Sequence, residues 1–173
     1  FNGKDLILLD WELDDLAGQE YSLKLLTRSI ELPYINFCCI YSRSSNFSEI
    51  PFFVSAYFSG LSRADLDCIK AQYEYLTKEE IEKFWSNPDN NIEEFFSDNA
   101  ISISEFPIER LRNISLKELL NHIYIALDNQ RYVIPNDDEL ANYEVIPSSN
   151  DSFIVNNTFI LVLKKDEDSD SDF

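Results

Sequence analysis

The hydrophobic positions near the start of the chain change their period twice. Residues 5–9 form a short apolar run that closes on Asp10, and such a run predicts a strand buried on both faces of a parallel sheet. Residues 14–30 carry leucine and isoleucine near helical spacing, which predicts a helix that Pro33 ends. Residues 34–41 are aromatic and β-branched and predict a second strand. Strand, helix and strand in this order indicate a right-handed parallel unit.

The middle of the chain has a helical pattern with recognisable start signals. Ser62 can cap one helix, and Thr77 with Glu80 forms a capping box for another. Ser115 and Glu118 repeat the capping box before a stripe of leucine and isoleucine at helical spacing. In such a box each of the two residues satisfies a backbone N–H group of the other, so the three positions predict three helix starts.

Two further stretches have β-like patterns. Residues 100–106 alternate between apolar and polar side chains and stop at Pro107, which predicts a third, half-buried strand. Residues 131–164 contain short β-like runs divided by prolines and asparagines, and they predict a β-rich appendage. Residues 165–173 form an acidic tail that cannot bury itself.

Composition limits the partners and the compartment. The 173 residues suffice for one domain with an appendage, and a start at Phe1 in a chain without methionine suggests a piece of a longer polypeptide. Fourteen basic against 32 acidic side chains give a net charge of −18, which repels phosphate backbones and anionic lipids, so we expect no direct nucleic-acid binding. No apolar run approaches the roughly 20 residues of a membrane span, so we expect no membrane association. Three cysteines without zinc spacing favour reduced thiols and a cytoplasmic location.

The strand that ends at Asp10 carries the most specific chemistry. Open α/β sheets bind their ligands at the carboxyl ends of their strands, where this acid is expected to lie. A carboxylate there can accept a phosphoryl group or hold Mg²⁺, a hard cation that prefers oxygen ligands. Gly18, eight residues later, allows a tight turn before the following helix.

The segment Leu-Leu-Asp-Trp-Glu-Leu-Asp-Asp-Leu-Ala-Gly, residues 8–18, resembles the phosphoacceptor segment of two-component response-regulator receiver domains. The resemblance implies an α/β fold of the receiver-like (flavodoxin-like) kind, a three-layer parallel sheet that is incomplete at its N-terminus. The receiver-like domain would span residues 1–130, with a helical insertion at about residues 46–98, and the β appendage would follow at residues 131–164.

The same resemblance implies roles for individual residues. Asp10 would be the phosphoacceptor, and Ser42, after the second strand, would be the switch hydroxyl that senses phosphorylation. Asp10 and Glu12 would be candidate Mg²⁺ ligands, although an acidic helix start and a plain loop hydroxyl are alternatives for Glu12 and Ser42. Receiver domains carry a lysine immediately before the proline after their fifth strand, whereas Phe106 precedes Pro107 here. We therefore expect a degenerate pseudo-receiver, a signalling and protein-interaction module and not an enzyme.

The partner is expected to be a protein or a covalently linked output domain. Trp11, Phe58 and Trp85 are candidate interaction residues because aromatic side chains anchor many interfaces, with core packing as the alternative. An acidic binding protein, such as an immunity factor or a nucleic-acid mimic that engages a basic partner, is a second hypothesis. A Mg²⁺-dependent phosphohydrolase built on the Asp10 strand is a third. His122 is the sole histidine of the chain, and a structural role is favoured over that of a catalytic base.

Overall fold

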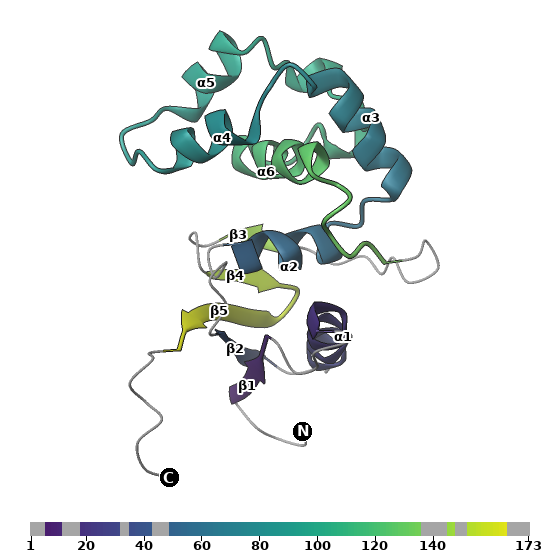
Figure 1. Cartoon of the computed structure of the whole chain (residues 1–173), viewed down its shortest axis with the longest axis vertical. Coiled ribbons are helices and arrows are strands. Elements are labelled where there is room, and N and C mark those ends of the chain that lie inside the picture. Colours follow the sequence, from purple (N-terminus) through teal and green to yellow (C-terminus); the bar gives the residue numbers. More distant parts are fainter. Residues whose placement is uncertain are drawn as a thin grey trace. The chain divides into compact units, whose positions relative to one another are not determined.

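A computed structural model of the chain describes residues 6–11, 18–31, 35–42, 49–135, 145–147 and 152–165. The contacts divide the chain into two compact units. The first, here called the sheet unit, comprises Phe1–Gly60 and Asp138–Phe173, and the second, the helical unit, comprises Leu61–Asp137. Figure 1 shows the strands in the sheet unit and the packed helices of the helical unit.

The sheet unit contains one five-stranded sheet in the order β1-β2-β5-β4-β3. The neighbours β1, β2 and β5 are parallel, whereas β4 pairs antiparallel with β5 and β3 pairs antiparallel with β4. The bounds are β1 Leu6–Asp10, β2 Asn36–Ser42, β3 Val145–Pro147, β4 Ser152–Val155 and β5 Thr158–Lys164. The predicted receiver-like α/β arrangement is confirmed in the parallel strands β1 and β2 and the helix that joins them.

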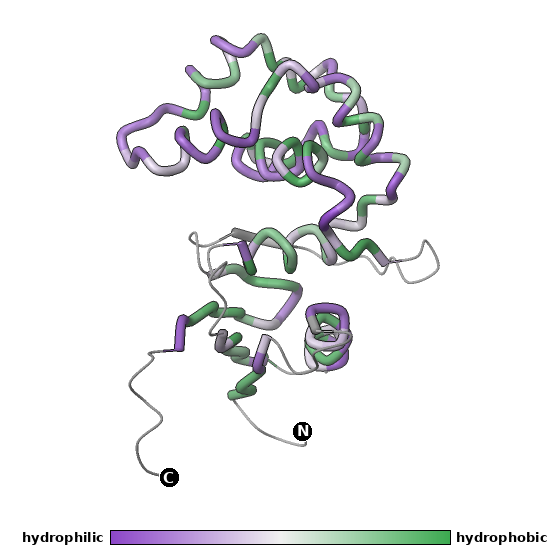
Figure 2. Tube along the Cα trace, viewed as in Figure 1, coloured by the Kyte–Doolittle hydropathy of each residue, from purple (hydrophilic) through white to green (hydrophobic). Residues whose placement is uncertain are grey.

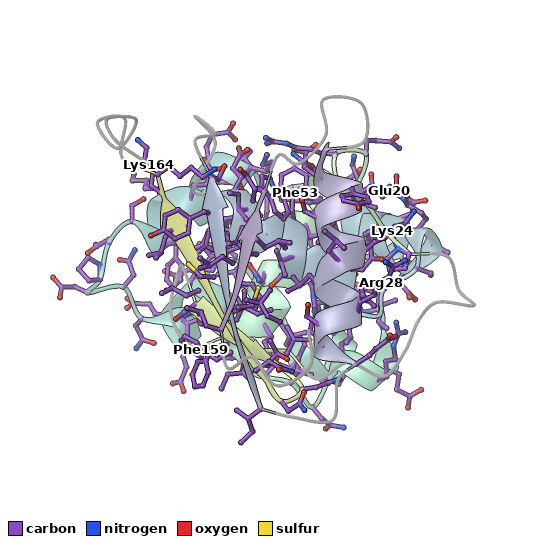
Figure 3. All side chains as sticks on the ribbon, turned by 90° about the horizontal axis from the view of Figure 1, so that it is seen from below. Glu20, Lys24, Arg28, Phe53, Phe159 and Lys164 are labelled. Atoms are coloured by element: carbon purple, nitrogen blue, oxygen red, sulfur yellow. The ribbon has the colours of Figure 1, made fainter. Side chains whose placement is uncertain are left out.

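Helix α1, Gly18–Ile30, connects β1 to β2 and packs on β1. Its buried face carries Leu23, Leu26 and Ile30, as its helical spacing predicts. Glu20, Lys24 and Arg28 lie on the opposite side, away from the strands (Figure 3), and Glu20 pairs with Lys24 across one turn at 2.7 Å.

The prediction that the first strand is buried on both faces is wrong. Ile7 and Leu9 are buried, whereas Leu6 and Leu8 are 55% and 68% exposed. The buried face is the one that α1 covers, because the side-chain amide of Asn36, on the buried face of β2, donates to the Ser29 carbonyl of α1 at 3.1 Å. A strand that is buried on one face needs apolar residues only at alternate positions. In β1, however, every residue before Asp10 is apolar.

Helix α2, Ile50–Phe58, follows β2 and is apolar over most of its length. Figure 2 shows this hydrophobic character in α2 and in the strands of the sheet. Pro51 stands in its first turn, where the missing N–H group leaves no hydrogen bond unmade. Gly60, at a φ of +65°, closes the sheet unit before the helical unit begins.

The helical unit contains four α-helices and two short 3₁₀ turns among the described residues. Their bounds are α3 Arg63–Tyr73, α4 Lys78–Trp85, α5 Ile92–Asp98, η2 Ile103–Glu105, η3 Glu109–Leu111 and α6 Leu116–Leu127. The three predicted helix starts are confirmed, because α3, α4 and α6 each begin with a reciprocal capping box. Helix α6 packs on α3, α4 and α5 and buries its apolar stripe.

The third strand predicted at residues 100–106 does not form. This stretch contains the 3₁₀ turn η2 and ends at Phe106, which is fully buried with its ring stacked on Tyr73 at 5.7 Å. Ala100 has a φ of 52°, a turn conformation that breaks an extended run at its first residue. An alternating pattern leads to a strand only where a partner strand is available. This stretch lies among helices and has no such partner among the described residues.

The C-terminal runs also differ from the prediction. They were expected to form an appendage, but β3, β4 and β5 belong to the same sheet as β1 and β2. Strand β5 pairs in parallel with β2 over its full length, from Asn36↔Thr158 to Ser42↔Lys164. The helical unit is therefore inserted in the sequence between strands of one sheet, and its bounds are Leu61–Asp137 where residues 46–98 were expected.

Candidate functional site

The candidate site lies where the three parallel strands end. Asp10 of β1 pairs in register with Tyr41 of β2, which in turn pairs with Leu163 of β5. The next residue of β2, Ser42, pairs with Lys164. Because the carboxyl ends of parallel strands meet at one edge of a sheet, the ends of β1, β2 and β5 lie side by side here.

A lysine that the sequence analysis assigned to the acidic tail completes this edge. The Lys165 ammonium donates to Oδ2 of Asp10 at 2.5 Å, although 155 positions separate the two residues. The Lys165 side chain is 25% exposed and that of Asp10 is 38% exposed, so the pair is accessible from solvent. Such a charge-assisted bond holds a carboxylate and a cation in direct contact at the strand ends.

The backbone of Lys165 is held by the same sheet. Its N–H group donates to the carbonyl of Ser42 at 2.8 Å, which extends the β2–β5 ladder by one residue. Side chains alternate along a strand, and Lys165 is two residues beyond Leu163, so it projects to the same face as Asp10. The contact between Lys165 and Asp10 thus follows from strand register.

Ser42, the candidate switch hydroxyl, is at the same edge but faces the other way. It is fully buried, and it shares the alternation of Asn36, Cys38 and Ile40 on the face that α1 covers. The structure therefore brings Asp10 and Lys165 into contact, and it places Ser42 at the adjoining strand end on the opposite face.

Trp11, the residue after Asp10, is an interior residue. Its side chain is 2% exposed, and its ring meets Phe53 of α2 edge-on at 6.1 Å. Its backbone N–H group donates to the Tyr41 carbonyl at 3.0 Å. Trp11 thus links the end of β1 both to β2 and to α2.

The other two candidate interaction residues also have aromatic neighbours. Phe58, at the end of α2, is buried and meets Tyr57 edge-on at 5.1 Å. Trp85, in the helical unit, is partly exposed, and its ring lies 5.0 Å from that of Tyr124. Burial of Trp11 and Phe58 means that neither side chain is presented to a partner in this conformation.

A serine that the sequence analysis did not single out contacts the end of β1 from the helix. The Ser22 hydroxyl of α1 lies 3.0 Å from the carbonyl oxygen of Asp10 and 2.9 Å from that of Trp11. Its position on the apolar face of α1, beside Leu23 and Leu26, is the one signal in the sequence that could have drawn attention to it.

The described residues do not by themselves form a magnesium site. No group of three histidine, cysteine, aspartate or glutamate side chains that could hold a metal ion occurs in the part of the chain that the structure describes. Glu12, the second predicted ligand, lies outside that part. Asp10 contributes a single carboxylate, of which Oδ2 is engaged by Lys165.

A mostly parallel α/β sheet with an aspartate at one strand end and a lysine facing it defines a domain built like a signalling receiver. Comparison with protein families agrees, since residues 1–94 match the model described as a response receiver domain. The match covers more than half of the 173 residues and includes β1, α1, β2 and α2, so the chain belongs to the response receiver domain family.

Membership confirms the predicted receiver resemblance, and receiver domains are generally non-catalytic signalling modules. Receiver domains typically bind Mg²⁺ at an acidic site and interact with proteins or output domains. No curated protein and no solved structure matches the chain. None of the described helices is both long enough and apolar enough to cross a membrane.

Proposed function

We propose that this receiver domain accepts a phosphoryl group on Asp10 and that Lys165 stabilises the phosphorylated state. The observation that supports the proposal is the contact of 2.5 Å between the Lys165 ammonium and Asp10 Oδ2 at the carboxyl edge of the sheet. The sequence-based expectation of a degenerate receiver depended on the absence of a lysine before Pro107. We propose that Lys165, which directly follows β5, fills that role instead.

The chemistry requires a carboxylate that a phosphoryl donor can reach. A carboxylate oxygen of Asp10 attacks the phosphorus atom of an acyl phosphate, the bond from phosphorus to the donor oxygen breaks, and the donor leaves as a carboxylate. The product is an acyl phosphate on Asp10, which carries more negative charge than the free carboxylate. The partly exposed Asp10 side chain offers access, and the Lys165 ammonium lies where the added charge develops.

The signal is proposed to leave the site through groups that touch the end of β1. Trp11 follows the acceptor directly and packs on Phe53, so a change at Asp10 is transmitted to α2. Ser42 remains the proposed switch hydroxyl; for this role its side chain has to turn from the buried face toward the acceptor edge. A protein partner or a covalently linked output domain would receive the signal.

The direct test is the intact mass of the full-length protein after incubation with acetyl phosphate and MgCl₂. We expect one phosphoryl adduct on the native protein, none on Asp10→Asn, and a normal adduct on Asp98→Asn, an exposed aspartate of α5 that serves as the matched control. A native protein that is folded but gains no adduct would show that phosphotransfer is lost. That outcome would leave a pseudo-receiver that acts through protein interaction alone.

A further inference from the structure

The end of β1 is held by a side chain from the helix that follows it. Ser22 lies near the start of α1, is fully buried, and places its hydroxyl oxygen 3.0 Å from the Asp10 carbonyl and 2.9 Å from the Trp11 carbonyl. A hydroxyl has one hydrogen to donate, so the two carbonyl oxygens share it. They are the backbone carbonyls of the acceptor residue and of its immediate neighbour.

These two contacts define the backbone shape at the acceptor. Consecutive carbonyls of an extended strand point to opposite sides, so one hydroxyl cannot reach both unless the chain turns between them. The Trp11 N–H group still donates to Tyr41, which means that the ladder with β2 continues up to this residue. The chain therefore turns at Trp11, where the ladder with β2 ends, and Ser22 bridges the turn.

Strand register sets the face on which the Asp10 side chain lies, and the turn holds the backbone from which its carboxylate extends. The partner cation is held separately, because the Lys165 N–H group donates to the Ser42 carbonyl. The ion pair thus depends on two backbone anchors, one at Lys165 and one at Asp10. Reactions that need close alignment of two groups are sensitive to displacements of about 1 Å.

We propose that Ser22 is a positioning residue for phosphoryl acceptance, acting through the backbone of Asp10 and Trp11. This inference rests on the proposed function of Asp10. Ser22 does not touch the phosphoryl donor; it orients the carboxylate that does. Loss of its hydroxyl leaves the two carbonyls without their shared donor and releases the turn.

The test compares two buried serines of the same helix. Ser22→Ala removes the hydroxyl that reaches β1. Ser29→Ala removes one that, among the described residues, bonds to the Leu25 carbonyl of its own helix at 3.1 Å, and Ser29 is also buried. Ser22→Thr returns a hydroxyl to the first position. For each variant of the full-length protein, the rate of adduct formation is measured over a range of acetyl phosphate concentrations, together with the midpoint of thermal unfolding.

We expect Ser22→Ala to lower the limiting rate by about 10-fold, with little change in the concentration that gives half of it, because alignment and not donor binding is lost. Ser29→Ala should stay within about twofold of the native rate, and Ser22→Thr should recover most of the loss. Should Ser22→Ala fail to fold, Ser22→Cys keeps the volume and a weaker donor and is expected to fall between the native and fully impaired rates.

Three results would overturn the inference. Ser22→Ala could form the adduct at the native rate, Ser22→Ala and Ser29→Ala could be slowed equally, or a folded Ser22→Thr could be no faster than Ser22→Ala. Each of these leaves the proposed function intact, because the native protein still forms the adduct. A native protein without any adduct removes the proposed function and this inference with it, so the two failures are told apart by the native sample alone.

Discussion

The Lys165–Asp10 pair leads to a prediction in which stability and chemistry respond differently to one substitution. In the resting state both side chains are partly exposed, at 25% and 38%, and an ion pair of this kind contributes less than about 1 kcal/mol to folding. Lys165→Ala should therefore change the free energy of unfolding by less than about 1 kcal/mol. The variant remains folded, so its chemistry can be compared directly with that of the native protein.

The phosphorylated state makes a larger demand on the same lysine. A phosphoryl group carries a charge of about −1.5 to −2 at neutral pH. Two unit charges about 4 Å apart attract each other by about 4 kcal/mol at an effective dielectric constant of about 20, and exposure to solvent reduces this to about 1 to 2 kcal/mol. Since about 1.4 kcal/mol corresponds to a factor of ten, Lys165→Ala should slow adduct formation about 10-fold.

The assay is the time course of adduct mass with acetyl phosphate and MgCl₂ at low and at high salt. Lys164→Ala is the matched control, because it removes the same charge from the preceding, exposed residue. Lys165→Arg retains the charge and should keep most of the rate, and the difference between Lys165→Ala and Lys164→Ala should shrink as salt rises. Equal rates for Lys165→Ala and Lys164→Ala would refute the assignment of Lys165 to the site.

Two further predictions concern the helical unit. Burial and then the nearby charge of Arg110 lower the pKa of His122 to about 4, and its Nδ1 has no hydrogen-bond partner among the described residues. As pH falls from 6.5 toward 4, His122 of the unfolded chain gains a proton that the folded chain excludes. The free energy of unfolding, measured in urea, should therefore be about 1 kcal/mol lower at pH 5.5 than at pH 7.5. This loss should be absent in His122→Gln. Phe106→Ala should lower the free energy of unfolding by about 3 to 5 kcal/mol, because the ring is fully buried on Tyr73. Ile103→Ala, at a partly exposed position, should lower it by less than about 1 kcal/mol. Equal losses in urea titrations of the two variants would contradict this packing.

Features that depend on neighbouring residues could be predicted from the sequence. The capping boxes at Ser62, Thr77 and Ser115 form because the two members of each box are three residues apart, and no distant part of the chain is needed. The strand that ends at Asp10 and the helix that follows it were found for the same reason. Asp10 itself could be singled out because it ends a predicted parallel strand, where open α/β sheets bind their ligands.

Features that depend on strand pairing could not be predicted in this way. Residues 100–106 alternate like a strand but lie among helices, and residues 158–164 supply the strand beside β2 although about 115 residues separate the two. A single sequence contains no record of which strand pairs with which. The sequence pattern therefore indicated the wrong element for the lysine, the stretch before Pro107. The predicted acidic tail began at residue 165, so Lys165 was not expected to pair with β2.

The periodic elements, their caps and the acidic residue at the end of the first strand can be read from local sequence, because each is set by residues within a few positions of one another. Tertiary structure alone decided that Lys165 meets Asp10, that Ser42 faces away from it, and that Ser22 reaches the carbonyls of Asp10 and Trp11. These contacts follow from the register of β1, β2 and β5 and from the packing of α1. Both are settled by the burial of one face of the whole sheet, which no local stretch of sequence specifies.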